Sequence, residues 1–283
     1  MKPQLAASYD RDFTTLVRGA CLTIATRLGD LIDDCMIVGG LVPSLLLDQS
    51  GIPDHGRHIG TRDVDIGLSL KVLDGERYTA IAERLRGAGF VPDTNPDSGN
   101  PTPQRWISPA TRITIDFLIG PGETPNDQPA RVWKLQQDLS AFIIPGIEAA
   151  FGDAELVHLE GVTLDDVQAA CDIRVCGPGA FVVLKALAFG IRREPKDAYD
   201  LHFMLTNHPD GLEDIARRIR GLQDQALVTR ALAYLAADYE TTEHFGPQYA
   251  ARFVQRDTDA AYLADVKGAM DELRRLLQGC DET

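Results

Sequence analysis

The stretch Arg62-Asp63-Val64-Asp65-Ile66 places two aspartates two positions apart, with an apolar residue between them and another after them. Successive side chains of a β-strand point to opposite faces, so Asp63 and Asp65 share one face while the valine and the isoleucine point toward a core. The stretch Arg112–Ile119 alternates in the same way and sets Asp116 opposite three apolar side chains. We therefore predict two strands, and three carboxylates that converge on one patch if the strands are neighbours.

Three carboxylates on one patch repel one another unless a cation neutralises them. Hard oxygen ligands of this kind suit Mg²⁺, with Mn²⁺ as the alternative ion, and two such ions can clamp an attacking hydroxyl and a leaving pyrophosphate. A lone Asp-x-Asp pair is also typical of a solvated strand face or of a turn. We predict Asp63, Asp65 and Asp116 as catalytic metal ligands, and Asp116 as the group that accepts the proton of the acceptor hydroxyl.

A diglycine turn lies upstream of the first aspartate pair. Cys35–Val38 predicts a short apolar strand, and Leu41–Leu47 predicts a helix that starts from Gly39 and Gly40 and carries Ser44. Glycines let the backbone approach a phosphate closely, and a helix N-terminus offers free N–H groups to an anion. Strand–Gly-Gly–helix turns are common, but one that precedes this aspartate pattern indicates a nucleotide-binding turn.

The second half of the chain adds one lysine and two aspartates. Lys185 lies in the apolar helical stretch Phe181–Phe189, where a lysine either snorkels to solvent or serves as a fixed ammonium for a triphosphate. Pro195 begins a further helix, on which Asp197 and Asp200 share a face. A surface ion pair is the alternative reading of these two aspartates.

The remaining pattern predicts an α/β region followed by helices. The loop Asp48–Gly60 is rich in Gly, Pro, His and Asp, and its Asp54–His58 run is either a surface loop or a set of metal ligands. The other expected elements are helices at Phe13–Leu31 and Tyr78–Gly89, a loop at Asp93–Pro103, strands at Leu156–Leu159 and Ile173–Val175, and helix from Phe181 onward with breaks at Gly190, Pro195, Pro209 and Pro247.

Taken in order, the Gly-Gly turn with Ser44, R-D-V-D-I, K-A-L-A-F-G-I-R-R and K-D-A-Y-D-L resemble the AbiEii/AbiGii type of nucleotidyltransferase toxin. This group, which includes the MenT toxins, belongs to the DNA-polymerase-β-like nucleotidyltransferases. The resemblance covers roughly Ile37–Leu205, and the 22 residues between Gly40 and Asp63 exceed the compact form of the motif. It implies an α+β fold, with a mixed-sheet head and flanking helices at 1–178 and a mainly helical C-terminal domain at 179–283.

The resemblance also implies a function. Such a toxin transfers a nucleotide from an NTP to an acceptor hydroxyl, in MenT toxins the 3′ end of tRNA, which blocks translation until a cognate antitoxin acts. By residue match, Asp63, Asp65, Lys185 and Asp200 belong to the expected catalytic set. Asp116 joins the set by its strand pattern and position more than by a motif. Gly39, Gly40, Ser44 and Lys185 form the expected nucleotide-binding set. Asp200 either orients Lys185 or holds the base or ribose of the nucleotide.

Charge is the main objection to a nucleic-acid partner. The chain has 42 acidic and 28 basic residues, a net charge of −14, and this field repels a polyanion unless a local basic surface exists. That surface is expected from Arg192, Arg193, Lys196, Arg217, Arg218 and Arg220. The alternatives are nucleotidylation of a protein or small-molecule hydroxyl, and a catalytically inactive binding or antitoxin-like module.

The five cysteines are scattered without a C-x-x-C pair, which is typical of thiols in a reducing compartment. We see no secretory signal pattern and no apolar run of membrane-spanning length. The sequence therefore predicts a cytoplasmic protein without a membrane partner.

Overall fold

The computed structural model describes residues 5–9, 11–47, 56–69, 75–121 and 132–279. The chain groups into two compact units. The sheet unit consists of Arg11–Val42 and Gly60–Cys176, and the helical unit consists of Met1–Asp10, Pro43–Ile59 and Gly177–Thr283. The chain therefore passes between the units four times, whereas the sequence suggested one boundary at 178/179.

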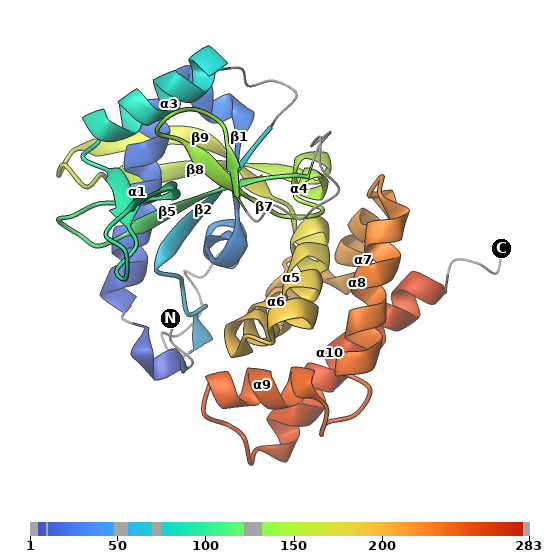
Figure 1. Ribbon diagram of the computed structural model, residues 1–283. Helices are drawn as coiled ribbons and strands as arrows, with labels where there is room; N and C mark the ends of the chain where they lie inside the picture. The colour runs from blue at the N-terminus through green and yellow to red at the C-terminus, as the bar shows by residue number, and fades with distance from the viewer. Residues whose placement is uncertain (1–4, 10, 48–55, 70–74, 122–131, 280–283) are drawn as a thin grey trace. The chain divides into compact units, whose positions relative to one another are not determined.

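A mixed β-sheet forms the centre of the sheet unit (Figure 1). Its described strands run in the order β3-β4-β5-β2-β1-β9-β8, and β7 pairs with both β5 and β6. The α+β class with a mixed sheet and many helices, expected from the sequence, is confirmed. The strands are β1 (Cys35–Val38), β2 (Asp63–Leu68), β3 (Val91–Thr94), β4 (Pro101–Ile107), β5 (Thr114–Ile119), β6 (Val132–Lys134), β7 (Ser140–Ile143), β8 (Ala154–Val162) and β9 (Gln168–Cys176).

The register of the central strands brings the polar residues of interest into one row. β2 and β5 are parallel neighbours, and Asp65 lies opposite Asp116. On one side β1 pairs with β2 so that Val38 lies opposite Asp65, and on the other side β4 pairs with β5 so that Arg105 lies opposite Asp116. The alternate residues of these strands, Val64, Ile66, Ile115 and Phe117, are fully buried, because residues one position apart on a strand point to opposite faces.

Helices pack on this sheet within the same unit (Figure 1). α1 (Arg11–Leu28) contacts β2, β8 and β9 through buried side chains that include Val17, Ile24 and Leu28. α3 (Gly75–Gly87) packs against α1, and the short α4 (Glu148–Gly152) contacts β1 and β9. Short 3₁₀ turns at Gly29–Asp34 and Gly39–Leu41 flank β1. α2 (Val42–Leu46) follows the second turn and belongs, from Pro43 onward, to the helical unit.

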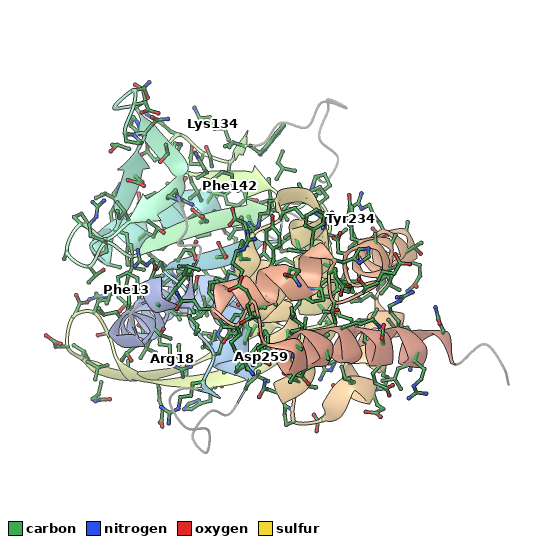
Figure 2. All side chains as sticks on the ribbon, turned by 90° about the horizontal axis from the view of Figure 1, so that it is seen from below. Phe13, Arg18, Lys134, Phe142, Tyr234 and Asp259 are labelled. Atoms are coloured by element: carbon green, nitrogen blue, oxygen red, sulfur yellow. The ribbon has the colours of Figure 1, made fainter. Side chains whose placement is uncertain are left out.

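The helical unit consists mainly of six helices packed around one another, preceded in sequence by the 3₁₀ turn Ala6–Ser8. α5 contacts α6, α7 and α8, and α10 contacts α6, α7 and α9. Asp259 caps α10 by accepting hydrogen bonds from the backbone N–H groups of Ala261 and Tyr262 (Figure 2). The bounds are α5 (Pro178–Arg192), α6 (Pro195–Asn207), α7 (Gly211–Gly221), α8 (Gln225–Asp238), α9 (Phe245–Phe253) and α10 (Ala260–Gln278).

Three sequence-based predictions about these elements were wrong. The expected loop Asp93–Pro103 is a loop only at 95–100, because Asp93 and Thr94 end β3 and β4 begins at Pro101. Proline is tolerated at the first position of a strand. Gly190 lies inside α5, where a Cβ would come within 2.4 Å of the Tyr234 ring of α8 (Figure 2). Pro247 lies in the first turn of α9, where a backbone N–H is not needed.

The cysteines that the structure describes are free thiols, and Cys21, Cys35 and Cys176 are buried. Burial raises the pKa of Cys21 and of Cys35 to about 12, so both thiols stay protonated at neutral pH. Among the described residues, no helix combines the length and the apolar composition that crossing a membrane requires.

Candidate functional site

Asp63, Asp65 and Asp116 lie together on the sheet unit. One carboxylate oxygen from each lies within 4.8 Å of the others. The parallel pairing of β2 with β5 sets Asp65 opposite Asp116, and Asp63 lies two residues before Asp65 on the same face. Asp63 and Asp116 are buried and Asp65 is partly exposed. The convergence expected from the strand pattern is therefore present, and its donor set of three hard oxygen ligands is of the kind that Mg²⁺ binds.

The diglycine turn lies directly beside these carboxylates. Gly39 has a φ of 72°, in the left-handed region, and a Cβ built on it would lie 1.9 Å from Oδ2 of Asp65. A side chain at position 39 is therefore excluded both by backbone conformation and by space. The following helix α2 has only five residues and therefore contributes little helix dipole. An anion could bind this turn through the backbone rather than through the dipole.

Arg105 is a site residue that sequence reasoning missed. Its Nε and Nη2 donate to the two oxygens of Asp116, each over 2.6 Å. This hydrogen bonding to Asp116 is the main cause that raises the pKa of Arg105, and the charges of Asp116, Asp63 and Asp65 add to it against the effect of burial. The residue was missed because β4 was expected to be a loop up to Pro103, so no partner strand for β5 was predicted there.

Lys185 and Asp200 belong to a second cluster, which lies within the helical unit. Lys185 Nζ donates to Asp200 Oδ2 over 2.7 Å and to Asp197 Oδ1 over 2.8 Å. Lys196 Nζ also binds Asp200, over 2.7 Å, and Arg192 forms two hydrogen bonds to Asp197. All but Arg192 are buried. Lys185 is therefore held by carboxylates and does not snorkel to solvent, and the aspartates are not a surface pair.

The charges in this cluster stabilise one another. Burial alone would lower the pKa of Lys185, but Asp197 and Asp200 outweigh it and the pKa is raised. Burial would likewise raise the pKa of Asp197, but Lys185 and Arg192 hold it at about 2. The pKa of Asp200 is lowered further by Lys185, Lys196 and His58. Lys185, Asp197 and Asp200 are thus charged at neutral pH.

Ser44 joins the same cluster through His58, which sequence reasoning placed in a surface loop or a metal site. His58 Nε2 lies 2.9 Å from Asp200 Oδ1, and His58 Nδ1 lies 2.9 Å from Ser44 Oγ. Because the carboxylate must accept, His58 donates from Nε2 and receives the Ser44 proton at Nδ1. Burial lowers the pKa of His58 to about 4, so it is neutral. Asp54 and His55 of the same run lie outside the described residues.

The expected basic surface of the helical unit is largely neutralised. Arg192 binds Asp197, Arg193 binds Asp238, and the buried Lys196 binds Asp200. Arg217 and Arg218 both bind Asp214, and Arg220 donates to the carbonyl of Leu276. Five of the six expected cations therefore already face a carboxylate, which reduces their attraction for a polyanion.

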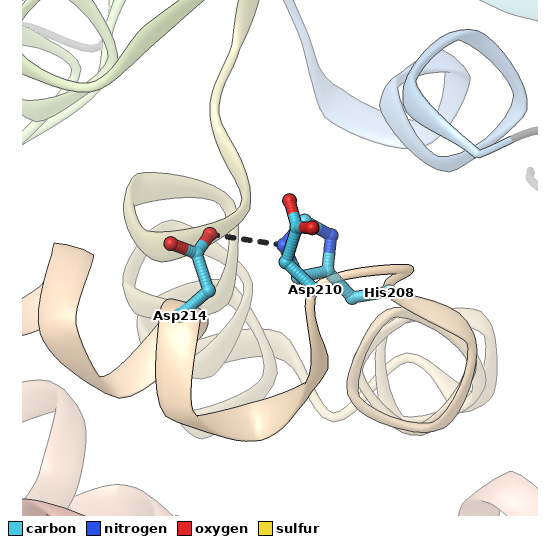
Figure 3. A group of neighbouring side chains, drawn as sticks. All are labelled: His208, Asp210 and Asp214. Atoms are coloured by element: carbon cyan, nitrogen blue, oxygen red, sulfur yellow. Dashed lines mark hydrogen bonds and ion pairs between the residues drawn. The ribbon is translucent and has the colours of Figure 1, made fainter.

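A second group of metal-ligand types occurs at the start of α7, where His208, Asp210 and Asp214 lie together (Figure 3). His208 Nε2 lies 3.0 Å from Asp214 Oδ2. Asp214 also binds Arg217 and Arg218, and these hydrogen bonds hold its pKa below the usual range. Two arginines on the central carboxylate repel a cation, so the group is an ion-pair network at a helix start.

No protein-family model matches the chain, and no curated protein matches it either.

The site residues that were expected from the sequence fall into two groups in the structure. Gly39, Asp63, Asp65 and Asp116 gather on the sheet unit, whereas Ser44, Lys185 and Asp200 are linked within the helical unit. The first group has the chemistry to hold a divalent cation beside the Gly39 turn, and the second is a network of mostly buried charges.

Proposed function

We propose that the protein is a magnesium-dependent nucleotidyltransferase whose sheet unit is a polymerase-β-like head. The observation that carries the proposal is the meeting of Asp63, Asp65 and Asp116 beside the Gly39 turn. Three adjacent negative charges are stabilised by a cation, and we propose that the backbone of the adjacent turn binds the phosphates of the nucleotide. This combination fits a metal-bound triphosphate better than it fits a solvated strand face, because Asp63 and Asp116 are buried.

In the proposed reaction the acceptor oxygen forms a bond to the α-phosphorus, the bond to the β-phosphate oxygen breaks, and pyrophosphate leaves. Asp63, Asp65 and Asp116 would hold Mg²⁺, which when bound neutralises phosphate charge and polarises the reacting phosphorus. Asp116 accepts the hydroxyl proton. Phosphoryl-type transfer needs little other covalent chemistry from the protein, so positioning and charge are sufficient.

The resemblance to AbiEii/AbiGii toxins assigns Lys185 the role of supplying positive charge to the triphosphate, and we propose this role on that resemblance alone. The 2.7 Å bond between Lys185 and Asp200 supports the reading in which Asp200 orients the lysine. His58 and Lys196 occupy both oxygens of Asp200 as well. A carboxylate bound by three donors has little capacity left for a base or ribose, so we favour the orienting role.

For the acceptor we propose the 3′ end of tRNA, as part of a cytoplasmic toxin–antitoxin pair. This part rests on the resemblance of the motifs alone. The net charge of −14 and the paired arginines of the helical unit favour the second candidate, a hydroxyl on a protein or small molecule.

Incubation with each labelled NTP, Mg²⁺ and either tRNA or cell protein separates the candidates. We expect label on tRNA, its loss with a chelator, and its loss in Asp63→Asn. Asp172→Asn is the matched control, because Asp172 also lies on a strand of the sheet unit but forms an exposed ion pair with His158. Label on protein alone would overturn the tRNA proposal.

The inactive-module alternative is tested in cells. We expect expression of the protein to inhibit growth and Asp63→Ala to abolish the inhibition. Inhibition that persists in this variant would show that the carboxylates are not needed, and would contradict the enzyme proposal.

A further inference from the structure

We propose that Arg105 is a built-in competitor of the divalent cation, one that must release Asp116 before an ion can use all three carboxylates. The inference rests on the proposed metal site and concerns a residue that neither the motifs nor the resemblance include. It predicts that the wild-type protein binds its cation less tightly than the carboxylates alone would allow.

The first step of the argument is the position of Arg105. Val38, Asp65, Asp116 and Arg105 are direct neighbours on β1, β2, β5 and β4. The turn at Gly39 begins one residue beyond Val38, so the two carboxylates lie between a turn and a guanidinium. Directly opposite residues on neighbouring strands have side chains close enough to interact, which places the arginine at the end of the carboxylate row.

The second step is occupancy. Arg105 donates one hydrogen bond to each oxygen of Asp116, both over 2.6 Å. Bidentate pairs of this kind are among the strong hydrogen-bonded ion pairs of proteins. The oxygens so engaged are those that a cation needs as ligands. While the pair persists, Asp116 is also a poor acceptor for the proton of an acceptor hydroxyl.

The third step is charge. Each carboxylate carries one negative charge, and the Arg105 guanidinium offsets that of Asp116. An ion that displaces the guanidinium regains the charge of Asp116 as a ligand. The side chain of Arg105 is 38% exposed whereas that of Asp116 is 9% exposed, so the arginine can swing toward solvent while the aspartate stays in the site.

A purely structural ion pair makes the opposite prediction. If Arg105 only holds β4 on β5, its removal leaves Asp116 buried without a partner and loosens the site, and cation affinity falls or stays the same. If Arg105 competes, its removal frees a ligand and affinity rises. The direction of the change therefore distinguishes the two roles.

The experiment is a titration with Mn²⁺ alone, followed by calorimetry and by electron paramagnetic resonance of the free ion. We expect Arg105→Gln to bind Mn²⁺ at least about tenfold more tightly than wild type, the factor that corresponds to one charge-assisted hydrogen bond. Arg27→Gln, which removes an exposed ion pair with Asp165 elsewhere in the sheet unit, is the control and should leave the affinity unchanged.

A double variant tests whether the effect passes through Asp116. Asp116→Asn alone should weaken binding, and adding Arg105→Gln to it should produce no further gain. Should Arg105→Gln not fold, Arg105→Lys replaces the fork with a single point charge and should give a smaller increase in affinity.

The outcomes separate the two proposals. Equal or weaker Mn²⁺ binding by a folded Arg105 variant overturns the competitor role, while binding that Asp63→Asn abolishes still supports the metal site. If wild type and the Arg105 variants all fail to bind Mn²⁺, both proposals fail. If only the Arg105 variants bind, and Asp63→Asn removes that binding, both are supported.

Discussion

Gly39 is held by two separate constraints, a positive φ and the carboxylate of Asp65 beside it. An L-residue in this conformation costs about 1–2 kcal/mol, before any displacement of neighbours. We expect Gly39→Ala to lower the free energy of unfolding by at least that amount and to weaken Mn²⁺ binding, because Asp65 must move. Urea denaturation and calorimetry measure the two effects.

Gly268 provides the comparison for this prediction. It lies inside α10, where a Cβ would meet no neighbouring atom within 4 Å, so Gly268→Ala should stabilise the protein by about 0.5–1 kcal/mol. Similar effects of the two substitutions would mean that the Gly39 turn is not constrained as described.

His58 makes stability depend on pH. Its pKa is about 4 in the folded protein, against an ordinary value of 6.5, because burial opposes its charged form and Lys196 and Lys185 add repulsion that the bond to Asp200 only partly offsets. Between these two pH values the unfolded chain binds a proton that the folded protein does not. Stability is therefore fully present above about pH 6.5 and is lost as the pH falls toward 4.

From pH 7 to pH 5 we expect the free energy of unfolding to fall by about 2 kcal/mol more in wild type than in His58→Gln. Urea titrations of both proteins across this range measure the difference. Parallel pH profiles would show that His58 is not buried in its neutral form.

Site residues that follow a local sequence pattern could be predicted. Site residues that depend on a partner far away in the sequence could not. The alternation of β2 and β5 identified Asp63, Asp65 and Asp116 because strand period is a property of a few consecutive residues. Arg105 and His58 depend on partners that the sequence does not indicate, one across a strand pair and the other 142 residues away. The polar Arg105 directly precedes the apolar Trp106, and this change from polar to apolar could have suggested a strand.

At the scale of elements, helix α5 shows how packing overrides a local signal. Gly190 was expected to end the helix, yet α5 continues through it to Arg192. The missing side chain lets α5 approach Tyr234 of α8, since a Cβ would come within 2.4 Å of the tyrosine ring. The β3–β4 hairpin was also missed from the sequence, because the prolines near its irregular register are typical of a loop.

Gly190→Ala should therefore destabilise the protein by about 1–3 kcal/mol, the usual effect of overpacking, although alanine favours helix more than glycine does. Thermal and urea denaturation measure this change. In a Tyr234→Ala background the same substitution should be neutral or stabilising. A stabilising effect in the wild-type background would contradict the close packing of α5 on α8.

At the scale of the whole molecule, the sequence predicted the general class but not how the chain is shared between its units. A mixed sheet followed by helices could be read from periodicity and from glycines and prolines. The grouping of Met1–Asp10 and Pro43–Ile59 with the helices could not. It depends on contacts such as Tyr9 with Phe253 and His58 with Asp200, which no local pattern reveals.

The expected C-terminal domain, residues 179–283, should consequently be less stable alone than within the full chain. It lacks His58, which binds the buried Asp200. It also lacks Tyr9, whose ring contacts the ring of Phe253 and the ammonium group of Lys196. We expect its Tm to lie at least about 5 °C below that of the helices in the intact protein, as circular dichroism at 222 nm would show. An equal Tm would mean that the early segments add nothing to the helical unit.

The division of the helical unit along the chain also sets an order of events during synthesis. A ribosome releases Ser44 and His58 long before it reaches Asp200, which follows His58 by 142 residues. At ordinary elongation rates that interval is on the order of ten seconds. Throughout it the histidine lacks its partner Asp200, so the buried charge network is among the last parts of a nascent chain to form.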